Sequence, residues 1–456
     1  MASRNKIEND IDTDVVIVGA GVIGLEMTIL LNDLGVKTFT IARHRGTAPA
    51  PRAHITNMRT MEIFRDMNIE KVISEVLVPL KDLGSAWIGT SLTGLELGRY
   101  SSYGAGDEQF THYALSSPCK MESTPQNHME GVMLKRARET AADIRFFTEL
   151  VSIEQSPDGV LARVRDRGSQ VEYRVHACYA VGADAGRSTV AEQLGFGFTG
   201  KPGLMSMISS WLEMDLEKYT SSQPACLWWR MQAGNEYWVG SGLLLCIRPW
   251  NEWTLQWQYD PTQGEPDTSD EAIIEYARNT LGVHDPDLKF RVKRVTKWQE
   301  YSWSSDTQIL VQLSTTQLLS LLVYATQYCS MSRRKHPGAF LLHAWLEYKK
   351  CRILILDVLQ YGKFGLIVGI GGQSWVSAAA KLRRELEVEL PVHSIVKRCV
   401  YDDVLNEWTG RQEINDYGAQ LVRPDRYIAW RCSDRHSDPY QALRSALYSI
   451  LDRDIL

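Results

Sequence analysis

The clearest regular pattern in the chain is an apolar run, Val15–Val18, that leads directly into a glycine-rich turn. Four consecutive apolar residues are typical of a strand that is covered on both faces, as in a parallel sheet. After the turn, the segment LEMTILLNDLG carries apolar residues at helical spacing and stops at Gly35, a common type of helix end. This order of strand, turn and helix predicts the first unit of a Rossmann-like α/β domain.

The turn reads Gly19-Ala20-Gly21-Val22-Ile23-Gly24, and each glycine meets a different need. Gly19 permits a tight turn, Gly21 lets the backbone approach a pyrophosphate, and Gly24 lets helix and strand pack closely. The N–H groups at the helix start then face the phosphate charge. An ordinary turn between strand and helix can also be rich in glycine. The position directly between an apolar strand and a helix favours a dinucleotide site.

The second strand, in VKTFTIARHRG, lacks the acidic residue that often binds the ribose hydroxyls of a dinucleotide. Ala42 and Arg43 stand where that acid is expected. Their presence weakens the interpretation as a simple NAD dehydrogenase, although it does not separate NADP from FAD. We regard Arg43 as a candidate contact of the cofactor.

The middle of the chain changes to a pattern of alternating aromatic residues. Nine of the fourteen tryptophans lie between Trp211 and Trp303, and EYWVGSGLLLCIRPWNEWTLQWQYD predicts two strands joined near Pro249. Aromatic residues are favoured in any antiparallel sheet, so this pattern indicates either plain packing or an apolar wall for a planar substrate. Residues 269–282 then predict a helix with acidic residues in its first turn and a glycine stop.

Composition and charge exclude several classes of function. The net charge of −5 and the absence of a basic arm give no sign of a nucleic-acid partner. The eight cysteines form no CxxC pair and indicate free thiols in a reducing compartment. The N-terminus has no apolar signal region, and the apolar run from Ile309 is interrupted by polar residues, so we expect a cytoplasmic protein without a membrane span. The sequence contains no HExxH motif and no Cys/His cluster with ligand spacing, so it gives no sign of a metal site.

Four separated segments resemble the flavoprotein aromatic hydroxylases, in the branch that contains phenol 2-monooxygenase and 2,4-dichlorophenol 6-monooxygenase. In order, they are PRAHITNMRTMEIFRDMNIE from Pro51, LSSPCKMESTPQNHMEGVMLKRARE from Leu115, YAVGADAGRSTV from Tyr179 and CIRPWNEWTLQWQYD from Cys246. The resemblance runs from about Asp14 to Glu300. It implies that the dinucleotide is FAD, since the acid after the second strand is often missing in this branch.

The resemblance also implies the residues that bind FAD. Gly19, Gly21 and Gly24 would hold the pyrophosphate, and the further contacts would come from Arg52, Arg59, Gln126 and Asp184. A guanidinium suits phosphate or ribityl oxygens because it donates several hydrogen bonds at once. Ala185 and Gly186 exchange the order that is usual in the family motif. We expect strain if Ala185 takes a positive φ.

His54 is the candidate catalytic residue. In phenol-hydroxylating relatives its position carries a polar group near the substrate hydroxyl. An imidazole with the ordinary pKa near 6.5 would accept the phenol proton at neutral pH. The alternative is a histidine that only forms hydrogen bonds within the loop.

The family mechanism implies that NADPH reduces FAD and that the flavin C4a-hydroperoxide transfers one oxygen atom of O2 to a phenol. The substrate would be a small phenolic compound or, on family grounds, an aromatic polyketide. A degenerate flavoprotein without catalysis remains open, as does a possible homodimer. A nicotinamide dehydrogenase would need an acid or a clear phosphate site after the second strand and a set of hydride-transfer residues. The chain shows neither.

The resemblance stops after RVTKWQEYS. Residues 303–350 carry neither the family's second Gly-Asp motif nor its glycine-rich turn, and Gly338 is their only glycine. We interpret this segment as a frame-shifted or unspliced reading, with a divergent family member as the alternative. A transcript that encodes these residues as written would refute the first interpretation.

The resemblance returns at Leu356 with segments similar to a thioredoxin-like domain, here without CxxC and therefore expected to be structural. The expected fold is thus a Rossmann-like FAD-binding domain (α/β) with an inserted antiparallel-sheet domain (α+β) and a C-terminal thioredoxin-like domain. The expected boundaries are 1–205 for FAD, 206–302 for substrate, 303–350 for the anomalous segment, 351–433 for the thioredoxin-like domain and 434–456 for a tail helix.

Overall fold

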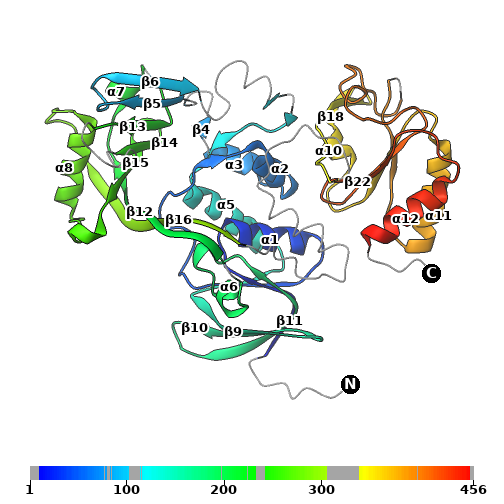
Figure 1. Ribbon diagram of the computed structural model, residues 1–456, viewed down its shortest axis with the longest axis horizontal. Coiled ribbons are helices and arrows are strands. Elements are labelled where there is room, and N and C mark those ends of the chain that lie inside the picture. The colour runs from blue at the N-terminus through cyan, green and yellow to red at the C-terminus, as the bar shows by residue number, and fades with distance from the viewer. Residues whose placement is uncertain are drawn as a thin grey trace. The chain divides into compact units, whose positions relative to one another are not determined.

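The computed structural model divides the chain into two compact units (Figure 1). The first comprises Met1–Tyr113 and Cys119–Gln308, and the second comprises Ala114–Pro118 and Ile309–Leu456. The residues that the structure describes are 10–76, 78–79, 83, 85–101, 113–114, 116–196, 198–222, 224–232, 242–305, 338–397 and 399–451.

The first unit begins with the predicted strand, helix and strand. They are β1 (Ile11–Val18), α1 (Val22–Asp33) and β2 (Thr38–Ala42), and Val15, Val16 and Ile17 are fully buried. The sheet has the order β8-β2-β1-β11-β10-β9, in which β1 runs parallel to β2 and β11, and β8 runs parallel to β2. Its other strands are β8 (Asp143–Phe146), β9 (Thr148–Ser156), β10 (Gly159–Asp166) and β11 (Glu172–Gly182). The Rossmann-like start is confirmed.

Helices and a small sheet surround the start of α1. Helix α1 packs against α5 (Gln126–Glu139), and α2 (Met58–Asp66) and α3 (Glu70–Val76) lie nearby (Figure 1). A three-stranded sheet has the order β3-β7-β4, with β3 (Ile55–Thr56), β7 (Glu122–Ser123) and β4 (Val78–Pro79). The 3-10 turn η2 (Ala185–Arg187) and helix α6 (Thr189–Gln193) follow β11.

A seven-stranded sheet forms the other half of the first unit, in the order β16-β12-β15-β14-β13-β5-β6. The strands are β5 (Ser85–Gly89), β6 (Glu96–Ser101), β12 (Phe198–Glu213), β13 (Leu227–Arg230), β14 (Leu243–Arg248), β15 (Glu252–Tyr259) and β16 (Arg291–Ser305). Strands β14 and β15 are the predicted antiparallel pair joined near Pro249. The short helix α7 (Glu217–Thr220) follows β12.

Helix α8 (Asp270–Leu281) covers one face of this sheet, and its ends are those that the sequence predicts. The Ser269 side chain accepts a hydrogen bond from Ala272 N, and Gly282 ends the helix at φ 64°. Trp257 of β15 stacks on Tyr276 of α8 with ring centroids 4.1 Å apart. Because side chains alternate along a strand, Trp253 and Leu255 lie on the same face as Trp257, towards α8.

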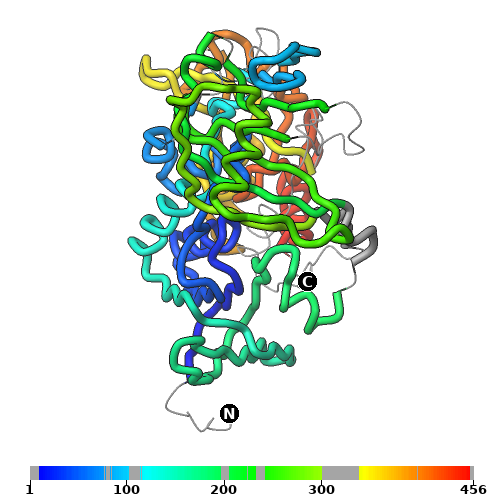
Figure 2. Tube along the Cα trace, turned by 90° about the vertical axis from the view of Figure 1, so that its left-hand side faces the viewer, coloured from blue at the N-terminus to red at the C-terminus, as the bar shows by residue number. Residues whose placement is uncertain are grey.

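The opposite face of the sheet is turned towards the small β3-β7-β4 sheet. Ile55, Val78 and Met121 pack against the core of the large sheet. Figures 1 and 2 agree that α8 and the elements around α1 lie on opposite sides of it. On β15 this inner face carries Glu252, Thr254 and Gln256, and on β12 it carries Trp211, which pairs directly with Thr254. We call this surface the inner face of the sheet.

The second unit contains a four-stranded sheet in the order β20-β19-β21-β22. Its elements follow the thioredoxin-like order βαβ and then ββα: β19 (Gly365–Val368), α11 (Gln373–Leu386), β20 (Val392–Ser394), β21 (Ala419–Val422), β22 (Ile428–Cys432) and α12 (Pro439–Ile450). The strands β19 and β20 are parallel, and the others are antiparallel. Trp375 is fully buried and donates through Nε1 to Tyr417 O at 2.8 Å.

Two parts of the second unit differ from the expectation. Residues 338–350 were assigned to an anomalous segment, yet Gly338 N donates to Ile428 O at 2.8 Å. In the same segment β17 (Trp345–Tyr348) pairs with β18 (Cys351–Leu354), which leads into α10 (Ile355–Val358). Helix α12 was expected as a tail, but its Leu443 and Leu447 are buried in one core with α11. Backbone pairing and apolar burial thus make both parts integral to this unit.

Candidate cofactor and substrate site

The corner between β1 and α1 is built on two glycines that have no room for a side chain. Gly19 has φ +112°, and a Cβ on it would lie 2.2 Å from Ala183 O. A Cβ on Gly24 would lie 1.8 Å from Gly19 O. Both contacts are with backbone, so any larger residue would force the first turn of α1 away from the sheet. The predicted tight turn and close packing are therefore present.

Gly21 differs because no contact with the described residues requires it to be glycine. A Cβ there would meet only Glu130 Oε1, at 3.7 Å. Gly21 is the N-cap of α1 and has no capping side chain, and the first turn of the helix holds no acidic residue. The first N–H groups of a helix have no partner within the helix, and together they attract an anion. The missing side chain thus leaves space in front of these donors, as a pyrophosphate needs.

Glu130 of α5 links this corner to two other segments. It is 2% exposed, accepts a hydrogen bond from Ala48 N at 2.6 Å and accepts a second from Gln126 Nε2 at 2.7 Å. Gln126 and Glu130 lie one helical turn apart, which brings their side chains together. Sequence reasoning named Gln126 and missed Glu130. The spacing of four residues between them was the available signal.

The predicted arginines do not form one group. Arg43 and Arg52 are exposed, and both lie close enough to His44 for their charges to add to burial in lowering the pKa of that histidine. Arg59 of α2 instead donates to Glu62 Oε2 at 2.8 Å. The structure thus brings Arg43 and Arg52 together near the loop after β2, and it directs Arg59 towards buried carboxylates.

Glu26 is a buried acid of α1 that the sequence analysis did not single out. It is 4% exposed, and burial raises the pKa of its carboxyl to about 7, against the attraction of the Arg59 charge. Glu62, which pairs with Arg59, is 1% exposed. The Arg59 guanidinium therefore pairs with Glu62 and acts on Glu26 through its charge alone, and burial brings the pKa of Glu26 into the neutral range.

Asp184 stands directly after the backbone segment that contacts Gly19. Its Oδ2 accepts hydrogen bonds from Thr189 N at 2.7 Å and Val190 N at 3.3 Å, at the start of α6. Its buried Oδ1 has no hydrogen-bond partner among the described residues. Ala185 follows with φ +64°, so the expected backbone strain is present. Asp184 thus holds the turn with one oxygen and offers the other to a ligand.

His54 is buried and close to the start of α5. Its backbone O accepts from Thr124 N at 2.5 Å, and Ala53 O accepts from Gln126 N at 2.9 Å. Burial lowers the pKa of His54 to about 4, so the expected pKa near 6.5 is wrong for this site. His54 is a neutral imidazole at neutral pH, and its Nε2 finds no partner in the described part of the chain.

The first turn of α5 also faces the inner face of the sheet. Burial lowers the pKa of His128, and the charges of Arg248 and Lys293 lower it further while Glu252 raises it, so these groups lie near its ring. Glu252 accepts from Lys293 Nζ at 2.6 Å and lies 3.5 Å from Arg248 Nε. The helix start that carries Gln126 is thereby placed opposite the sheet.

Buried polar atoms without hydrogen-bond partners occur both around the start of α5 and on the inner face of the sheet. Within the described ranges they are His54 Nε2, Thr124 Oγ1, Asn127 Oδ1, His128 Nδ1, Trp211 Nε1 and Thr254 Oγ1. Each such atom costs roughly 1–3 kcal/mol if it stays unsatisfied, so a cluster of them marks a place for ligand or water. The phosphate corner, Gln126 and this cluster together form a candidate site for a dinucleotide and a polar aromatic substrate.

Two family models match the chain. A model described as "FAD binding domain" matches residues 12–306, and one described as "Aromatic-ring hydroxylase, C-terminal" matches residues 334–453. The chain belongs to the FAD-binding aromatic-ring hydroxylases.

Relatives and solved structures agree with this family. The hydroxylase is 28% identical to 2,4-dichlorophenol 6-monooxygenase from Delftia acidovorans over 97% of this chain and 98% of the relative. The crystal structure of the flavin-dependent monooxygenase PieE with FAD and substrate has a TM-score of 0.87 at 24% identity, over 97% of this chain and all of PieE. That of aklavinone-11 hydroxylase with FAD and aklavinone has a TM-score of 0.79 at 22% identity, over 98% and 100%. These likenesses show the fold.

The comparison also bears on the segment without the second Gly-Asp motif. The two matched ranges leave residues 307–333 of the hydroxylase between them, so the second match begins inside the segment expected to be anomalous. The alignment with the Delftia relative runs over 578 positions, although this chain has 456 residues. The relative therefore carries stretches for which this hydroxylase has no counterpart.

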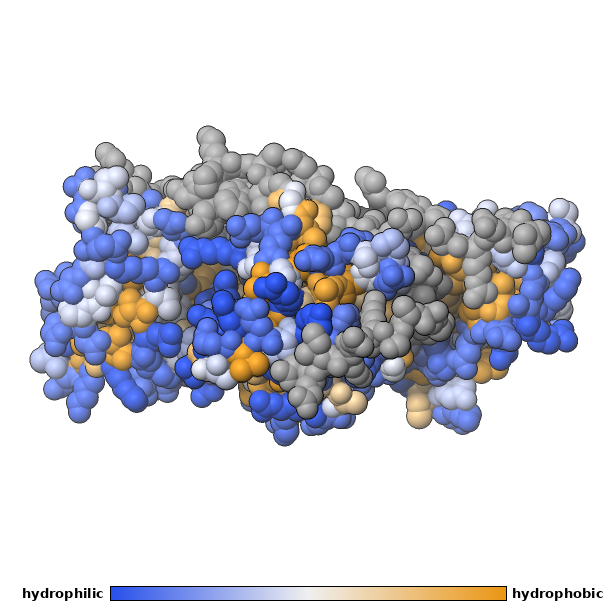
Figure 3. Space-filling view, turned by 90° about the horizontal axis from the view of Figure 1, so that it is seen from below, coloured by the Kyte–Doolittle hydropathy of each residue, from blue (hydrophilic) through white to orange (hydrophobic). Residues whose placement is uncertain are grey.

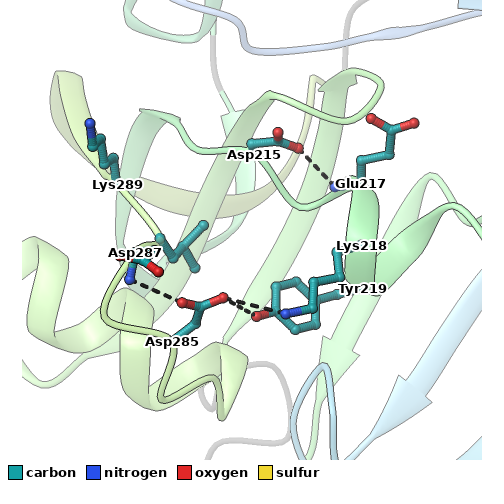
Figure 4. A pocket seen from close by; sticks show the side chains of 8 residues that line it. Asp215, Glu217, Lys218, Tyr219, Asp285, Asp287 and Lys289 are labelled. Carbon is teal, nitrogen blue, oxygen red and sulfur yellow. Dashed lines mark hydrogen bonds and ion pairs between the residues drawn. The ribbon is translucent and has the colours of Figure 1, made fainter.

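A hollow of about 580 Å³ lies elsewhere on the hydroxylase, between α7 and the segment after α8 (Figure 4). Several of its polar groups already bind one another. Asp285 accepts from Tyr219 Oη at 3.0 Å and from Asp287 N at 3.0 Å, and Asp215 accepts from Glu217 N at 3.0 Å. This pairing contrasts with the unpartnered groups near α5, and nothing in the hollow points to a ligand.

In the part of the chain that the structure describes, no helix has the length and apolar character needed to cross a membrane. No group of metal-binding side chains is found there, and the seven cysteines within the described ranges are free. On the face drawn in Figure 3, hydrophilic residues predominate among the coloured ones and apolar residues form small separate groups.

The strain at Ala185 predicts that exchanging the residues at positions 185 and 186 stabilises the hydroxylase. In Ala185→Gly/Gly186→Ala the glycine takes the positive φ, and the alanine enters a position with no atom within 4 Å of its Cβ. We expect the free energy of unfolding to rise by about 1 kcal/mol, measured by urea unfolding. Gly186→Ala alone is the control, and a double variant no more stable than this control would contradict the prediction.

Glu26 predicts a stability that depends on pH. Its pKa is raised from 4.5 when unfolded to about 7 when folded, so its carboxyl destabilises the fold increasingly as pH rises through this window. Glu26→Gln removes that change. We therefore expect the variant to gain about 2 kcal/mol over wild type between about pH 5 and pH 8, measured by urea unfolding. The exposed Glu139→Gln on α5 is the control, and an equal pH profile for wild type and Glu26→Gln would refute the assignment.

Proposed function

We propose that this chain is a monooxygenase that hydroxylates a phenolic ring with FAD as cofactor and NADPH and O2 as co-substrates. The observation that carries the proposal is the cluster of buried, unpartnered polar atoms between the start of α5 and the inner face of the sheet, next to the phosphate corner. Its relative from Delftia is named for a phenol, which supports a phenolic substrate.

FAD suits the residues that are present at the corner. The N–H groups after Gly21 would bind the pyrophosphate, and the free Oδ1 of Asp184 would accept from a cofactor hydroxyl. Gln126, held by Glu130, would reach the flavin side. Arg43 and Arg52 remain proposed contacts of the cofactor. Arg59 also remains a proposed contact of the cofactor, with its Nη1 held by Glu62.

The flavin would supply the activation of O2, and the chain would supply binding, orientation and exclusion of water. One oxygen atom enters the ring in place of hydrogen, and the other leaves as water. NADPH and a proton provide the two electrons and two hydrogens that this balance needs. The buried inner face, with Leu243 and Leu245 beside Thr254, keeps the ring away from solvent.

His54 is proposed to orient the phenol rather than to take its proton fully. A pKa of about 4 makes its imidazole a weak base. A phenol has a pKa of about 10, so complete transfer to His54 would cost roughly 8 kcal/mol before any help from other groups. A neutral imidazole can still accept a hydrogen bond from the phenol hydroxyl through Nε2. That bond increases the electron density of the ring without a free phenolate.

A degenerate flavoprotein without catalysis is the second candidate. The observation that favours it is the lack of a second Gly-Asp motif in residues 303–350. In the family this segment would contact the cofactor as well, so its loss would weaken FAD binding. The frame-shift hypothesis bears on the same residues, because a transcript with a different reading of this segment would restore the motif.

The function is tested by NADPH oxidation with a panel of phenols, together with mass analysis of the product. We expect a phenol to stimulate oxidation and to gain one oxygen atom. In Glu130→Gln an NH2 group replaces one carboxylate oxygen and faces either Ala48 N or Gln126 Nε2. Both of these groups are donors, so one hydrogen bond is lost. FAD affinity and stimulated oxidation should therefore fall at least tenfold. The exposed Glu139→Gln on the same helix should behave as wild type. Oxidation that no phenol stimulates would refute the proposed function.

The proposed role of His54 is tested by the pH dependence of kcat/KM for a phenol. Because its pKa is lowered to about 4, His54 stays neutral above about pH 5, and we expect no break between about pH 5.5 and 7.5 from this residue. His54→Gln retains a hydrogen-bonding side chain and should lower kcat/KM less than His54→Phe does. A break near pH 6.5 that disappears in His54→Gln would contradict this role.

A further inference from the structure

Two of the unpartnered polar groups stand side by side on the inner face of the sheet. Trp211 of β12 and Thr254 of β15 are direct partners across adjacent antiparallel strands. Side chains at such positions point to the same face, with Cβ atoms about 5 Å apart. Trp211 Nε1 and Thr254 Oγ1 are both buried and have no hydrogen-bond partner in the described ranges, and Thr254 is only 2% exposed. A ligand atom between them could bind both.

The neighbours of this pair fix its position and leave its polar atoms available. The Lys293 ammonium lies 3.9 Å from the centroid of the Trp211 ring and is bound to Glu252, so it occupies the ring face and not the N–H. Glu252 and Lys293 are also the charges that act on His128 at the start of α5. The pair thus lies on the part of the sheet that faces the helix start next to the phosphate corner.

The chemistry of the two groups selects the kind of atom that they bind. An indole N–H only donates a hydrogen bond, so the partner of Trp211 must be an acceptor. The Thr254 hydroxyl either donates or accepts. The oxygen of a hydroxyl group can accept from Trp211 and either donate to or accept from Thr254. A carbonyl oxygen can accept from both residues when Thr254 donates. Apolar substituents such as chlorine would leave both groups unsatisfied, at a cost of roughly 1–3 kcal/mol each.

We propose that Trp211 and Thr254 bind a second oxygen of the substrate, so that this chain prefers aromatic compounds with two or more oxygen substituents over simple phenols. The inference rests on the proposed function, since the first oxygen is the phenol hydroxyl assigned to His54. His54 precedes β3 in the opposing layer, whereas the pair belongs to the sheet. The two anchors therefore hold a substrate from two sides and discriminate by the number and position of its oxygens.

The test compares two ligands with one ring system. A naphthol has one hydroxyl, and the dihydroxynaphthalene with its second hydroxyl on the other ring has two. Their dissociation constants are measured by isothermal titration calorimetry with the full chain, so that no turnover is needed. We expect wild type to bind the diol about tenfold more tightly than the naphthol, since each tenfold change corresponds to about 1.4 kcal/mol.

Two variants and one control test whether Trp211 and Thr254 cause this preference. Thr254→Val keeps a β-branched side chain without the hydroxyl, and Trp211→Phe keeps a ring under Lys293 without the N–H. Each should reduce the preference at least threefold while leaving the affinity for the naphthol nearly unchanged. Trp257→Phe is the matched control, since Trp257 lies on the same strand as Thr254, faces α8 and should keep the wild-type preference.

The outcomes separate this inference from the proposed function. No preference in wild type, or a preference that survives in both Trp211→Phe and Thr254→Val, means that water satisfies the pair and overturns the inference. In that case phenol-stimulated NADPH oxidation would still support the monooxygenase. A preference that depends on both residues supports the oxygen anchor even if no product forms, and the failure would then lie in the proposed chemistry.

Discussion

The backbone contact between Gly24 and Gly19 at the β1–α1 corner is the constraint on which the rest of the site depends. A Cβ on Gly24 would approach Gly19 O to 1.8 Å, so only glycine lets the first turn of α1 come this close. Gly19 in turn lies against Ala183, which brings Asp184 of the β11 turn to the same corner. From there Glu130 joins the loop at Ala48 to the start of α5. Proposed cofactor contacts from three separate segments thus share one rigid reference point.

The charges around this corner are unusual for a site that binds a diphosphate. Glu26, Glu62 and Glu130 are buried beside it, and Arg59 is the cation that interacts with the first two. Side-chain charge therefore adds little attraction for the phosphates. We therefore propose that the attraction comes from the N–H groups at the start of α1, helped by Arg43 and Arg52 at the surface. On this account we expect the geometry at the glycines to matter more for binding than any one basic residue.

Local pattern was enough to predict much of the fold. The β1–α1 unit, helix α8 with its Ser269 cap and the thioredoxin-like elements each follow from residues close in sequence. Other features depend on residues far apart. Glu130 links two segments only when Ala48 lies against α5, and Thr254 is a candidate anchor only because the sheet register sets it beside Trp211. The lowered pKa of His54 likewise comes from burial by distant segments, which its own sequence neighbours do not reveal.

The central claim is that the glycine corner and the residues facing it hold FAD even though residues 303–350 lack the second Gly-Asp motif. The most direct test is the amount of FAD bound per chain, measured by absorbance after purification and again after incubation with excess FAD and desalting. The account predicts about one FAD per chain. A folded chain that stays colourless after incubation with excess FAD would contradict it.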